Sequence, residues 1–501
     1  MTPAAGPYTG CDLGDMTPLC MPWRKVNDQL KPEFSYAAAA LSLELASTAY
    51  DMQIAPWRSA GWRDFSYLID GTLLSGPIVN GEAANGEYSE AQADHYQRQA
   101  AALIKRQTPI SLLRGTLRQR ESSDTCKCLV MIHPAAGGRY VAAIGFMGTG
   151  RRIYDWFSNF RMDREEETHK GFLQLTREFE SHLTGIEFPQ TARELGLARL
   201  TLADIFQSCR RPGSRFRVWM AGHSQGGAIM QLSAFREIRQ GMLRQNLIGY
   251  GFASPHVMYA SPGCDLSGFP LFHILNGDDV TPRVGALLHV GRCMIYRPDE
   301  EMRRICYGSG WNDPLFRAMF RQMAMIHDGK SCSMSIIALL QALESRPDQE
   351  SIALISKIAG SVLPDKLLAA LGSRTDQFLR FLIRRSEISY ARATGGEAIP
   401  QNLLAQYQAR LSHLMAQYGA QPVVRALFVA MGAPHRLRGT DRNTGGQAAY
   451  QYIVTRRFGA LRSYPNSGSV PRGGGRILRS RKAPPVSRYR RSVRRNQSTI
   501  R

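Results

Sequence analysis

A serine flanked by glycines at residues 222–227 is the part of the sequence best suited to covalent chemistry. The run reads Gly-His-Ser-Gln-Gly-Gly and places Ser224 between Gly222 and Gly226 in a Gly-x-Ser-x-Gly pattern. In this pattern the serine stands on a strained turn from a strand into a helix, where its hydroxyl can attack a carbonyl carbon. The two glycines are needed because a side chain there would collide with the crossing strand and helix. We therefore expect Ser224 to be a nucleophile.

The segments around this run have the secondary structure that such a turn requires. Residues 216–221 read as a strand and residues 228–238 as an amphipathic helix. A glycine- and serine-rich loop can match five residues by chance, but a strand directly before it and a helix directly after it favour the turn. The same turn would direct the N–H of Gln225 and the positive end of the helix toward a developing oxyanion.

A serine hydroxyl is a weak nucleophile, so this chemistry also needs a histidine to take its proton and a carboxylate to orient that histidine. Asp278 and Asp279 directly follow residues 271–275, which read as a strand. Neighbouring acids at a turn can also simply solvate a loop. The candidate histidines further on are His327, 48 residues after Asp279, and His435, 156 residues after it.

Strand-like and helix-like segments alternate over the first two thirds of the chain. The strand-like segments are residues 140–146, 216–221, 247–252 and 271–275, and the helical ones are residues 36–46, 172–183 and 228–238. This alternation is typical of βαβ units. We therefore predict an α/β fold with a largely parallel sheet.

Four motifs, one of which includes the run around Ser224, follow one another along the same part of the chain. They are Gly145-Phe146-Met147-Gly148-Thr149 with Tyr154-Asp155-Trp156-Phe157, His169-Lys170-Gly171-Phe172, Gly222 to Gly227 with Gly251-Phe252-Ala253-Ser254-Pro255, and Asp279-Val280-Thr281-Pro282-Arg283 with His289-Val290-Gly291. Together and in this order they resemble the class 3 lipases. The resemblance implies an α/β-hydrolase fold and cleavage of acylglycerol or phospholipid esters through an acyl-enzyme on the serine. The sequence departs from the family at Met147, where an arginine is usual.

The resemblance also assigns the acid and the histidine. It selects Asp279, which stands three positions before a proline, and leaves Asp278 as the alternative. It places the histidine after the acid by a gap similar to the one between the serine and the acid, ahead of a helix. This favours His327 over His435, although the aromatic residue that the family carries after this histidine is missing here.

The oxyanion hole and a lid are implied in the same way. The N–H of Gln225 and a donor at Thr149 would bind the oxyanion, and one such donor is worth ~3 kcal/mol in other hydrolases. Residues 150–162 combine aromatic side chains with arginines. This segment would either cover the cleft and contact lipid, as a lid does in the family, or pack as an ordinary surface helix.

The length of 501 residues is too large for one compact core, and the composition is that of a globular protein, with 44% hydrophobic and 21% charged residues. Changes in composition and hydrophobic periodicity along the chain predict four parts. They are an irregular arm at residues 1–33, an α/β-hydrolase domain at 34–333, a mostly helical region at 334–455 and an Arg-rich disordered tail at 456–501.

The net charge of +22 is concentrated at the C-terminal end. Residues 456–501 hold 14 Lys and Arg and no Asp or Glu, which leaves about +8 on the rest of the chain. Such a tail could bind an anionic membrane surface, whereas its scarcity of aromatic residues argues against nucleic acid. We predict no metal site and no cofactor, because the nine cysteines lack ligand spacing.

The first residues carry neither the basic nor the apolar segment of a Sec signal, and no run is long and apolar enough to span a membrane. We therefore expect a cytoplasmic protein, or one exported by another route, with possible peripheral membrane association. The sequence does not predict the oligomeric state. Two alternatives to a lipase stay open: a short-chain carboxylesterase or thioesterase, and a catalytically silent lipase-like protein that binds anionic partners.

Overall fold

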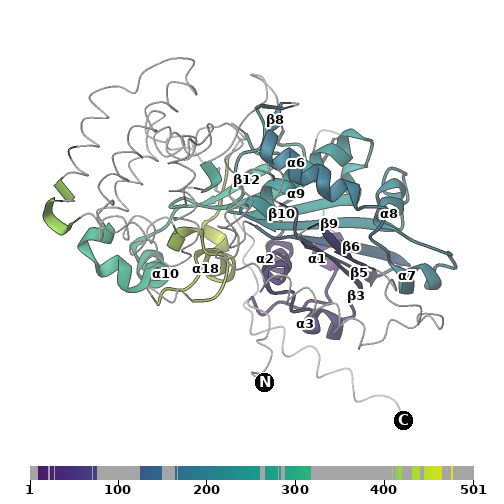
Figure 1. Ribbon diagram of the computed structural model, residues 1–501, viewed down its shortest axis with the longest axis horizontal. Coiled ribbons are helices and arrows are strands. Elements are labelled where there is room, and N and C mark those ends of the chain that lie inside the picture. The colour runs from purple at the N-terminus through teal and green to yellow at the C-terminus, as the bar shows by residue number, and fades with distance from the viewer. Residues whose placement is uncertain are drawn as a thin grey trace, which may run out of the picture.

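Ten of the described strands form one hydrogen-bonded sheet in the computed structural model of the protein, with helices on both of its faces (Figure 1). The structure describes residues 9–20, 23–26, 29–69, 71–75, 125–148, 164–165, 167–259, 266–279, 281–283, 288–317, 409, 413–414, 416–419, 432–440, 445–464 and 476–477. The order of the described strands in this sheet is β14-β13-β12-β11-β10-β9-β6-β5-β3-β4.

The centre of the sheet is parallel. It consists of β6 (Arg139–Phe146), β9 (Phe216–His223), β10 (Leu247–Phe252), β11 (Leu271–Asn276) and β12 (Arg292–Tyr296). The four strands predicted from the sequence are all among these five, so this part of the prediction is confirmed. Every residue of β10 and β11 is buried, as expected for parallel strands that are covered on both faces.

Antiparallel strands extend this centre on both sides. They are β5 (Cys128–Ala135), β3 (Arg63–Ile69) and β4 (Thr72–Leu74) next to β6, and β13 (Arg462–Tyr464) and β14 (Arg476–Ile477) next to β12. The sheet is therefore mixed, whereas the sequence predicted a largely parallel one. A tight turn at residues 136–138 reverses the chain between β5 and β6, and Gly137 and Gly138 supply its positive φ angles.

Helices α6 (Lys170–Ser181) and α9 (Gln225–Arg239) lie on one face of the sheet, and α2 (Tyr36–Asp51) lies on the other (Figure 1). These confirm the three predicted helices. The side chain of Ser35 accepts the N–H of Ala38 and so begins α2. Two apolar cores result, one between the sheet and α2 and one between the sheet and the α6–α9 pair.

Further described elements complete this arrangement. They are α1 (Thr17–Cys20), β1 (Trp23–Val26), β2 (Gln29–Pro32), α3 (Ala55–Ser59), β7 (Arg164–Glu165), β8 (Thr168–His169), α7 (Pro189–Glu194), α8 (Leu202–Ser208), α10 (Glu300–Asn312), α18 (Ala449–Arg456) and three 3-10 turns at Arg244–Asn246, Thr281–Arg283 and Phe458–Ala460.

Segments near both ends of the chain contribute to the core around α2. Leu13 and Met16, from the predicted irregular arm, are buried there, as are Tyr450 and Ile453 of α18. Residues 432–440 and 445–464, which the sequence assigns to the helical region and the tail, thus pack against the α/β part of the chain. Most of residues 334–455, and the predicted lid at 150–162, lie outside the described residues.

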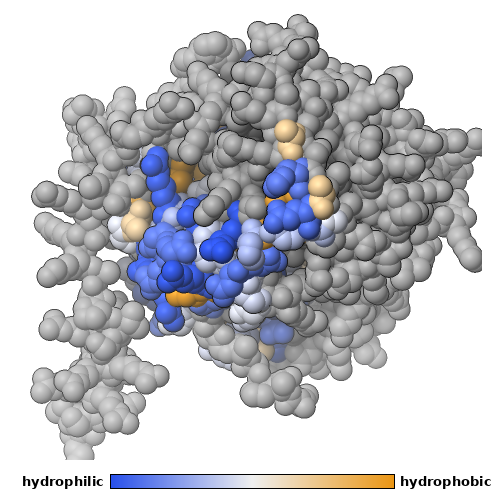
Figure 2. All heavy atoms as spheres, turned by 90° about the vertical axis from the view of Figure 1, so that its left-hand side faces the viewer, coloured by the Kyte–Doolittle hydropathy of each residue, from blue (hydrophilic) through white to orange (hydrophobic). Residues whose placement is uncertain are grey.

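The face that carries α10 and α18 is mostly hydrophilic where it is described (Figure 2). Glu300 forms an ion pair with Arg304, and Glu301 forms one with Arg457. Acidic and basic side chains therefore compensate one another on this surface.

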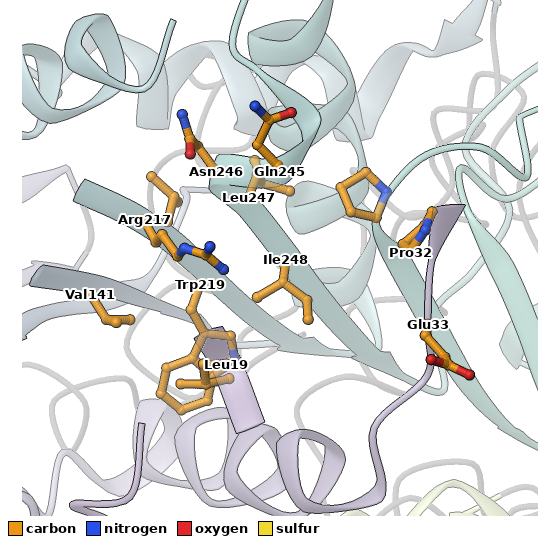
Figure 3. Close-up of a pocket in the computed structure, with 12 residues that line it drawn as sticks. Leu19, Pro32, Glu33, Val141, Arg217, Trp219, Gln245, Asn246, Leu247 and Ile248 are labelled. Carbon is orange, nitrogen blue, oxygen red and sulfur yellow. The ribbon is translucent and has the colours of Figure 1, made fainter. Parts of the chain in front are cut away.

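A recess lies at the amino-terminal ends of the central strands (Figure 3). Val141, Trp219 and Ile248 line it together with Arg217 and Glu33. Since Ser224 follows the carboxyl end of β9, this recess is at the opposite end of the strands from the serine. It is therefore separate from the candidate active site.

Two features of other protein classes are not seen in the described part of the chain. It contains no helix with the length and apolar character needed to cross a bilayer. Within the same residues, no three His, Cys, Asp or Glu side chains are grouped so that they could hold a metal ion.

Candidate active site

Ser224 stands at the turn between β9 and α9, as the sequence predicts. Its φ of 57° and ψ of −128° belong to neither a strand nor a right-handed helix. Such a backbone conformation costs a non-glycine residue on the order of 1–3 kcal/mol and persists only where its surroundings impose it. Here the N–H of Ser224 donates to the carbonyl oxygen of Phe252 on β10, over 2.9 Å, which fixes the turn to the neighbouring strand.

Gly222 and Gly226 meet the steric requirement of this turn. A Cβ atom on Gly222 would lie 2.4 Å from the carbonyl oxygen of Gly226. A Cβ atom on Gly226 would lie 2.3 Å from the carbonyl oxygen of Phe146, at the end of β6. Both are contacts with backbone atoms, which cannot turn away as a flexible side chain would. The collision expected from the sequence is therefore confirmed.

The backbone after β6 lies against the serine. A Cβ atom on Gly148 would lie 3.1 Å from the Cβ of Ser224. Gln225 is the first residue of α9, so its N–H belongs to the end of the helix where positive potential gathers. Thr149, the other predicted oxyanion donor, lies outside the described residues.

Asp279 follows β11 and its side chain is completely buried. Its Oδ2 accepts hydrogen bonds from Nδ1 of His435, at 2.9 Å, and from the hydroxyl of Tyr450, at 2.8 Å. Its Oδ1 accepts the N–H of Thr281 at 2.9 Å. Burial acts to raise the pKa of this carboxyl, but the charge of His435 and the three hydrogen bonds outweigh it and hold the pKa below its usual value.

Asp278 has different partners. Its two oxygens accept from the guanidinium of Arg303, each at 2.9 Å, and one also accepts from the hydroxyl of Tyr307 at 2.7 Å. Both partners belong to α10. The carboxylate that the sequence kept as an alternative acid is therefore engaged in anchoring a helix, while its neighbour Asp279 contacts a histidine.

His435 is the histidine that the structure places beside the acid. Its side chain is 24% exposed, whereas that of Asp279 is fully buried, so the imidazole has one edge toward the carboxylate and another that solvent can reach. The sequence analysis preferred His327, which lies outside the described residues.

Hydrogen bonds from three directions hold the segment that carries His435. Nδ2 of Asn276, at the end of β11, donates to the carbonyl oxygen of Pro434 over 2.9 Å. Nε2 of His223 donates to the carbonyl oxygen of His435, also over 2.9 Å. The N–H of Tyr450 on α18 donates to the carbonyl oxygen of Arg436 over 3.2 Å.

Sequence reasoning did not single out these supporting residues. Asn276 had a usable signal, because it is a polar residue at the end of a buried strand, directly before the acidic pair. His223 had another, because it occupies the variable position before the serine. Tyr450 had none, since nothing in its local sequence indicates a contact with a carboxylate 171 residues away.

Residues 143–288 match the family model described as lipase (class 3). The matched segment contains both Ser224 and Asp279, but it ends before His435. The resemblance to class 3 lipases inferred from the motifs is therefore confirmed over this part of the chain.

Solved structures similar to the chain are also lipases. The Rhizomucor miehei lipase propeptide complex is 22% identical over 34% of this chain and 52% of that one, with a TM-score of 0.25. Lipase II from Rhizopus niveus is 18% identical over 34% and 61%, with a TM-score of 0.24. The lipase from Rhizopus microsporus var. chinensis is 18% identical over 60% and 86%, with a TM-score of 0.26.

The chain spans only 52% of the Rhizomucor miehei lipase chain and 61% of the Rhizopus niveus one. No curated protein matches it.

Proposed function

We propose that the protein hydrolyses carboxylic esters of lipids, either acylglycerols or phospholipids, through an acyl-enzyme on Ser224. The observation that carries this proposal is the 2.9 Å contact between Nδ1 of His435 and the buried carboxylate of Asp279. His435 also contacts His223, the residue directly before Ser224 in its strained strand-to-helix turn. The lipid class of the substrate is supported by the match of residues 143–288 to class 3 lipases.

In the proposed mechanism His435 is the general base, in place of His327. Its Nδ1–H donates to Asp279, so its Nε2 has a lone pair that can accept the proton of the Ser224 hydroxyl. Ser224 Oγ then bonds to the ester carbonyl carbon while the carbonyl π electrons move to the oxygen. The imidazolium formed in this step is stabilised by the carboxylate.

The tetrahedral intermediate collapses when the C–O bond to the alcohol breaks and the imidazolium returns its proton to the leaving alkoxide. The acyl group stays on Ser224 until a water, which gives a proton to the same histidine, attacks the acyl carbon. The bond from that carbon to Ser224 Oγ then breaks, the imidazolium returns the proton to Oγ, and the carboxylic acid leaves. We propose that the N–H of Gln225 and a donor at Thr149 bind the oxyanion in both halves of the reaction. Each such donor is worth ~3 kcal/mol of transition-state stabilisation.

We also propose that the C-terminal basic residues bring the enzyme to an anionic lipid surface. Residues 478–501 contain nine Lys and Arg and no acidic residue. Near a membrane each such charge contributes on the order of 1 kcal/mol. For an enzyme whose substrate lies in a lipid surface, this attraction raises the local substrate concentration.

Hydrolysis of a matched pair of short- and long-chain esters tests the proposal. We expect turnover to fall by on the order of 10³-fold or more in Ser224→Ala and in His435→Ala, and to stay near native in His327→Ala. A fluorophosphonate should label the native chain and not Ser224→Ala. Anionic vesicles should stimulate the native chain, and a chain truncated after Ile477 should lose that stimulation.

Each alternative gives a different result. A native chain that is folded, inert and unlabelled would contradict the hydrolase proposal and favour a silent binding protein. Loss of activity in His327→Ala with His435→Ala still active would identify His327 as the base. Activity confined to short-chain esters would favour a carboxylesterase or thioesterase over a lipase.

A further inference from the structure

His223, the residue before the nucleophile, lies at the meeting point of three segments of the chain. Its side chain is 6% exposed. Nδ1 is 2.7 Å from the hydroxyl of Tyr50, at the end of α2, and Nε2 is 2.9 Å from the carbonyl oxygen of His435. The rings of His223 and His435 are neighbours, with centroids 4.6 Å apart.

These contacts allow only one arrangement of protons. A carbonyl oxygen only accepts, so Nε2 of His223 must carry a proton and donate it to His435. The Tyr50 hydroxyl already accepts the N–H of Gly148, over 3.1 Å, and gives its single proton to Nδ1. Burial lowers the pKa of His223 to about 3, and the nearby His435 adds to this effect, so the ring is neutral at pH 7. Both of its nitrogens are thus engaged.

The resulting chain of hydrogen bonds connects parts of the site that are distant in sequence. It runs from the N–H of Gly148, after β6, through the Tyr50 hydroxyl to His223 and on to the backbone of His435. The Gly148 end of this chain of hydrogen bonds lies against Ser224. It directly precedes Thr149, the proposed oxyanion donor. The other end carries the base.

We propose that His223 is a positioning residue that sets the base relative to the nucleophile and the oxyanion hole. It touches no reacting atom. By holding the carbonyl group of His435, it keeps that residue's imidazole at its 2.9 Å contact with Asp279. This inference rests on the proposed function, because positioning matters only if His435 is the base.

The need for such a connection follows from the chain itself. His435 is 212 residues from His223. The described residues around it, 432–440, form no strand, and the neighbours of β9 in the sheet are β6 and β10. The Gly-x-Ser-x-Gly pattern places no steric demand on the residue before the serine. A side chain with one donor and one acceptor at opposite ends, as in neutral imidazole, fits both of the contacts seen here.

Two conservative variants separate the roles of the two nitrogens. His223→Asn places an amide oxygen near the position of Nδ1, where it can accept from Tyr50, but it has no donor long enough to reach His435. His223→Gln extends an N–H donor toward the position of Nε2. We expect His223→Asn to lower kcat by about 10- to 100-fold with KM within about twofold of native. His223→Gln should recover kcat to within about threefold of native.

Melting temperatures and the rate of fluorophosphonate labelling complete the test. All variants should melt within a few degrees of the native chain, and the labelling rate should follow the same order as kcat because phosphonylation also needs the base. His223→Leu, which likewise lacks a donor, replaces His223→Asn if that variant does not fold.

The outcomes distinguish failure of this inference from failure of the proposed function. A native chain that is neither active nor labelled ends the hydrolase proposal whatever His223 does. A labelled, active native chain whose His223→Asn and His223→Leu variants keep native kcat overturns the positioning role. An equal loss in His223→Gln, with lowered melting temperature, would also overturn it, since it would indicate packing alone.

Discussion

At the scale of single residues, two adjacent carboxylates have separate tasks because their surroundings differ. Asp279 is buried against His435 and Tyr450, and Asp278 is bound by Arg303 and Tyr307 of α10. A one-residue step along the chain past the end of β11 is enough to direct the two side chains to different partners. The proposal of Asp279 rather than Asp278 as the acid that orients the histidine therefore rests on their hydrogen-bond partners, since the two side chains are chemically identical.

Amide substitutions should separate these tasks. Asp279→Asn should lower turnover by on the order of 10⁴-fold, because the amide no longer fixes the histidine tautomer or stabilises its charge. Asp278→Asn should leave turnover near native but reduce the free energy of unfolding by about 3 kcal/mol, because Arg303 loses its charged partner. Ester hydrolysis and urea unfolding measure the two effects. A collapse of activity in folded Asp278→Asn would instead identify that residue as the acid.

At the scale of elements, the site depends on how closely α9 approaches the end of β6. The first turn of α9 meets the backbone at Phe146 and Met147, and a Cβ atom on Gly226 would lie 2.3 to 2.8 Å from atoms of these two residues. This approach brings together the amino end of α9, Ser224 and the backbone of residues 146–148 at the end of β6. If α9 were moved outward by the width of one methyl group, these parts would be separated.

Gly226→Ala should therefore weaken both stability and activity. The added methyl group has to move α9 or β6, and overpacking of this kind costs about 1–3 kcal/mol. We expect a lower urea midpoint and a loss of turnover of about 10-fold or more, because the oxyanion donors move relative to Ser224. Gly459→Ala is the matched control, since nothing lies within 4 Å of its added Cβ. Equal behaviour of the two variants would show that the close approach is unimportant.

At the scale of the whole molecule, three buried imidazoles make the fold sensitive to acid. Burial lowers the pKa of His223 and His273 to about 3 and that of His289 to about 4. Each Nε2 donates to a backbone carbonyl, and for His273 and His289 these belong to Val290 and Ser254, at 2.7 Å. For each ring the loss of hydration on burial is the largest cause of the lowered pKa, and at His223 it outweighs the opposing attraction of the Asp279 carboxylate.

Stability should consequently fall as the pH falls below about 6.5. Unfolded histidines bind protons near pH 6.5, whereas these three stay neutral in the folded chain until about pH 3 to 4. Their contribution is complete above pH 6.5 and is lost below it, with a slope of up to about 4 kcal/mol per pH unit for three protons. Asp64 and Glu237, whose pKa burial raises, oppose part of this trend.

Urea unfolding at pH 7, 6 and 5 measures this dependence. His289→Gln keeps a donor toward Ser254 and should reduce the slope by about a third. A free energy of unfolding that is flat between pH 7 and 5 would contradict the prediction.

The sequence alone determined the local parts of the site. The strained turn at Ser224, its two glycines, the acidic pair after a strand and the central strands all follow from patterns within a few residues, because sterics and hydrophobic periodicity act at that range. The same reasoning predicted a largely parallel sheet. It missed the antiparallel strands, since pairing at the edges is decided by which distant segments meet.

Only the tertiary structure placed His435, Tyr450 and Asn276 together around Asp279. Spacing could not choose between histidines 48 and 156 residues beyond the acid, because the entropy of closing a loop grows only with the logarithm of its length. The longer closure costs only about 1 kcal/mol more. Ala433, Leu437, Tyr450 and Ile453 are buried in the core around α2, so the packing of these distant residues, which spacing along the chain does not reveal, accompanies the contact of His435 with Asp279.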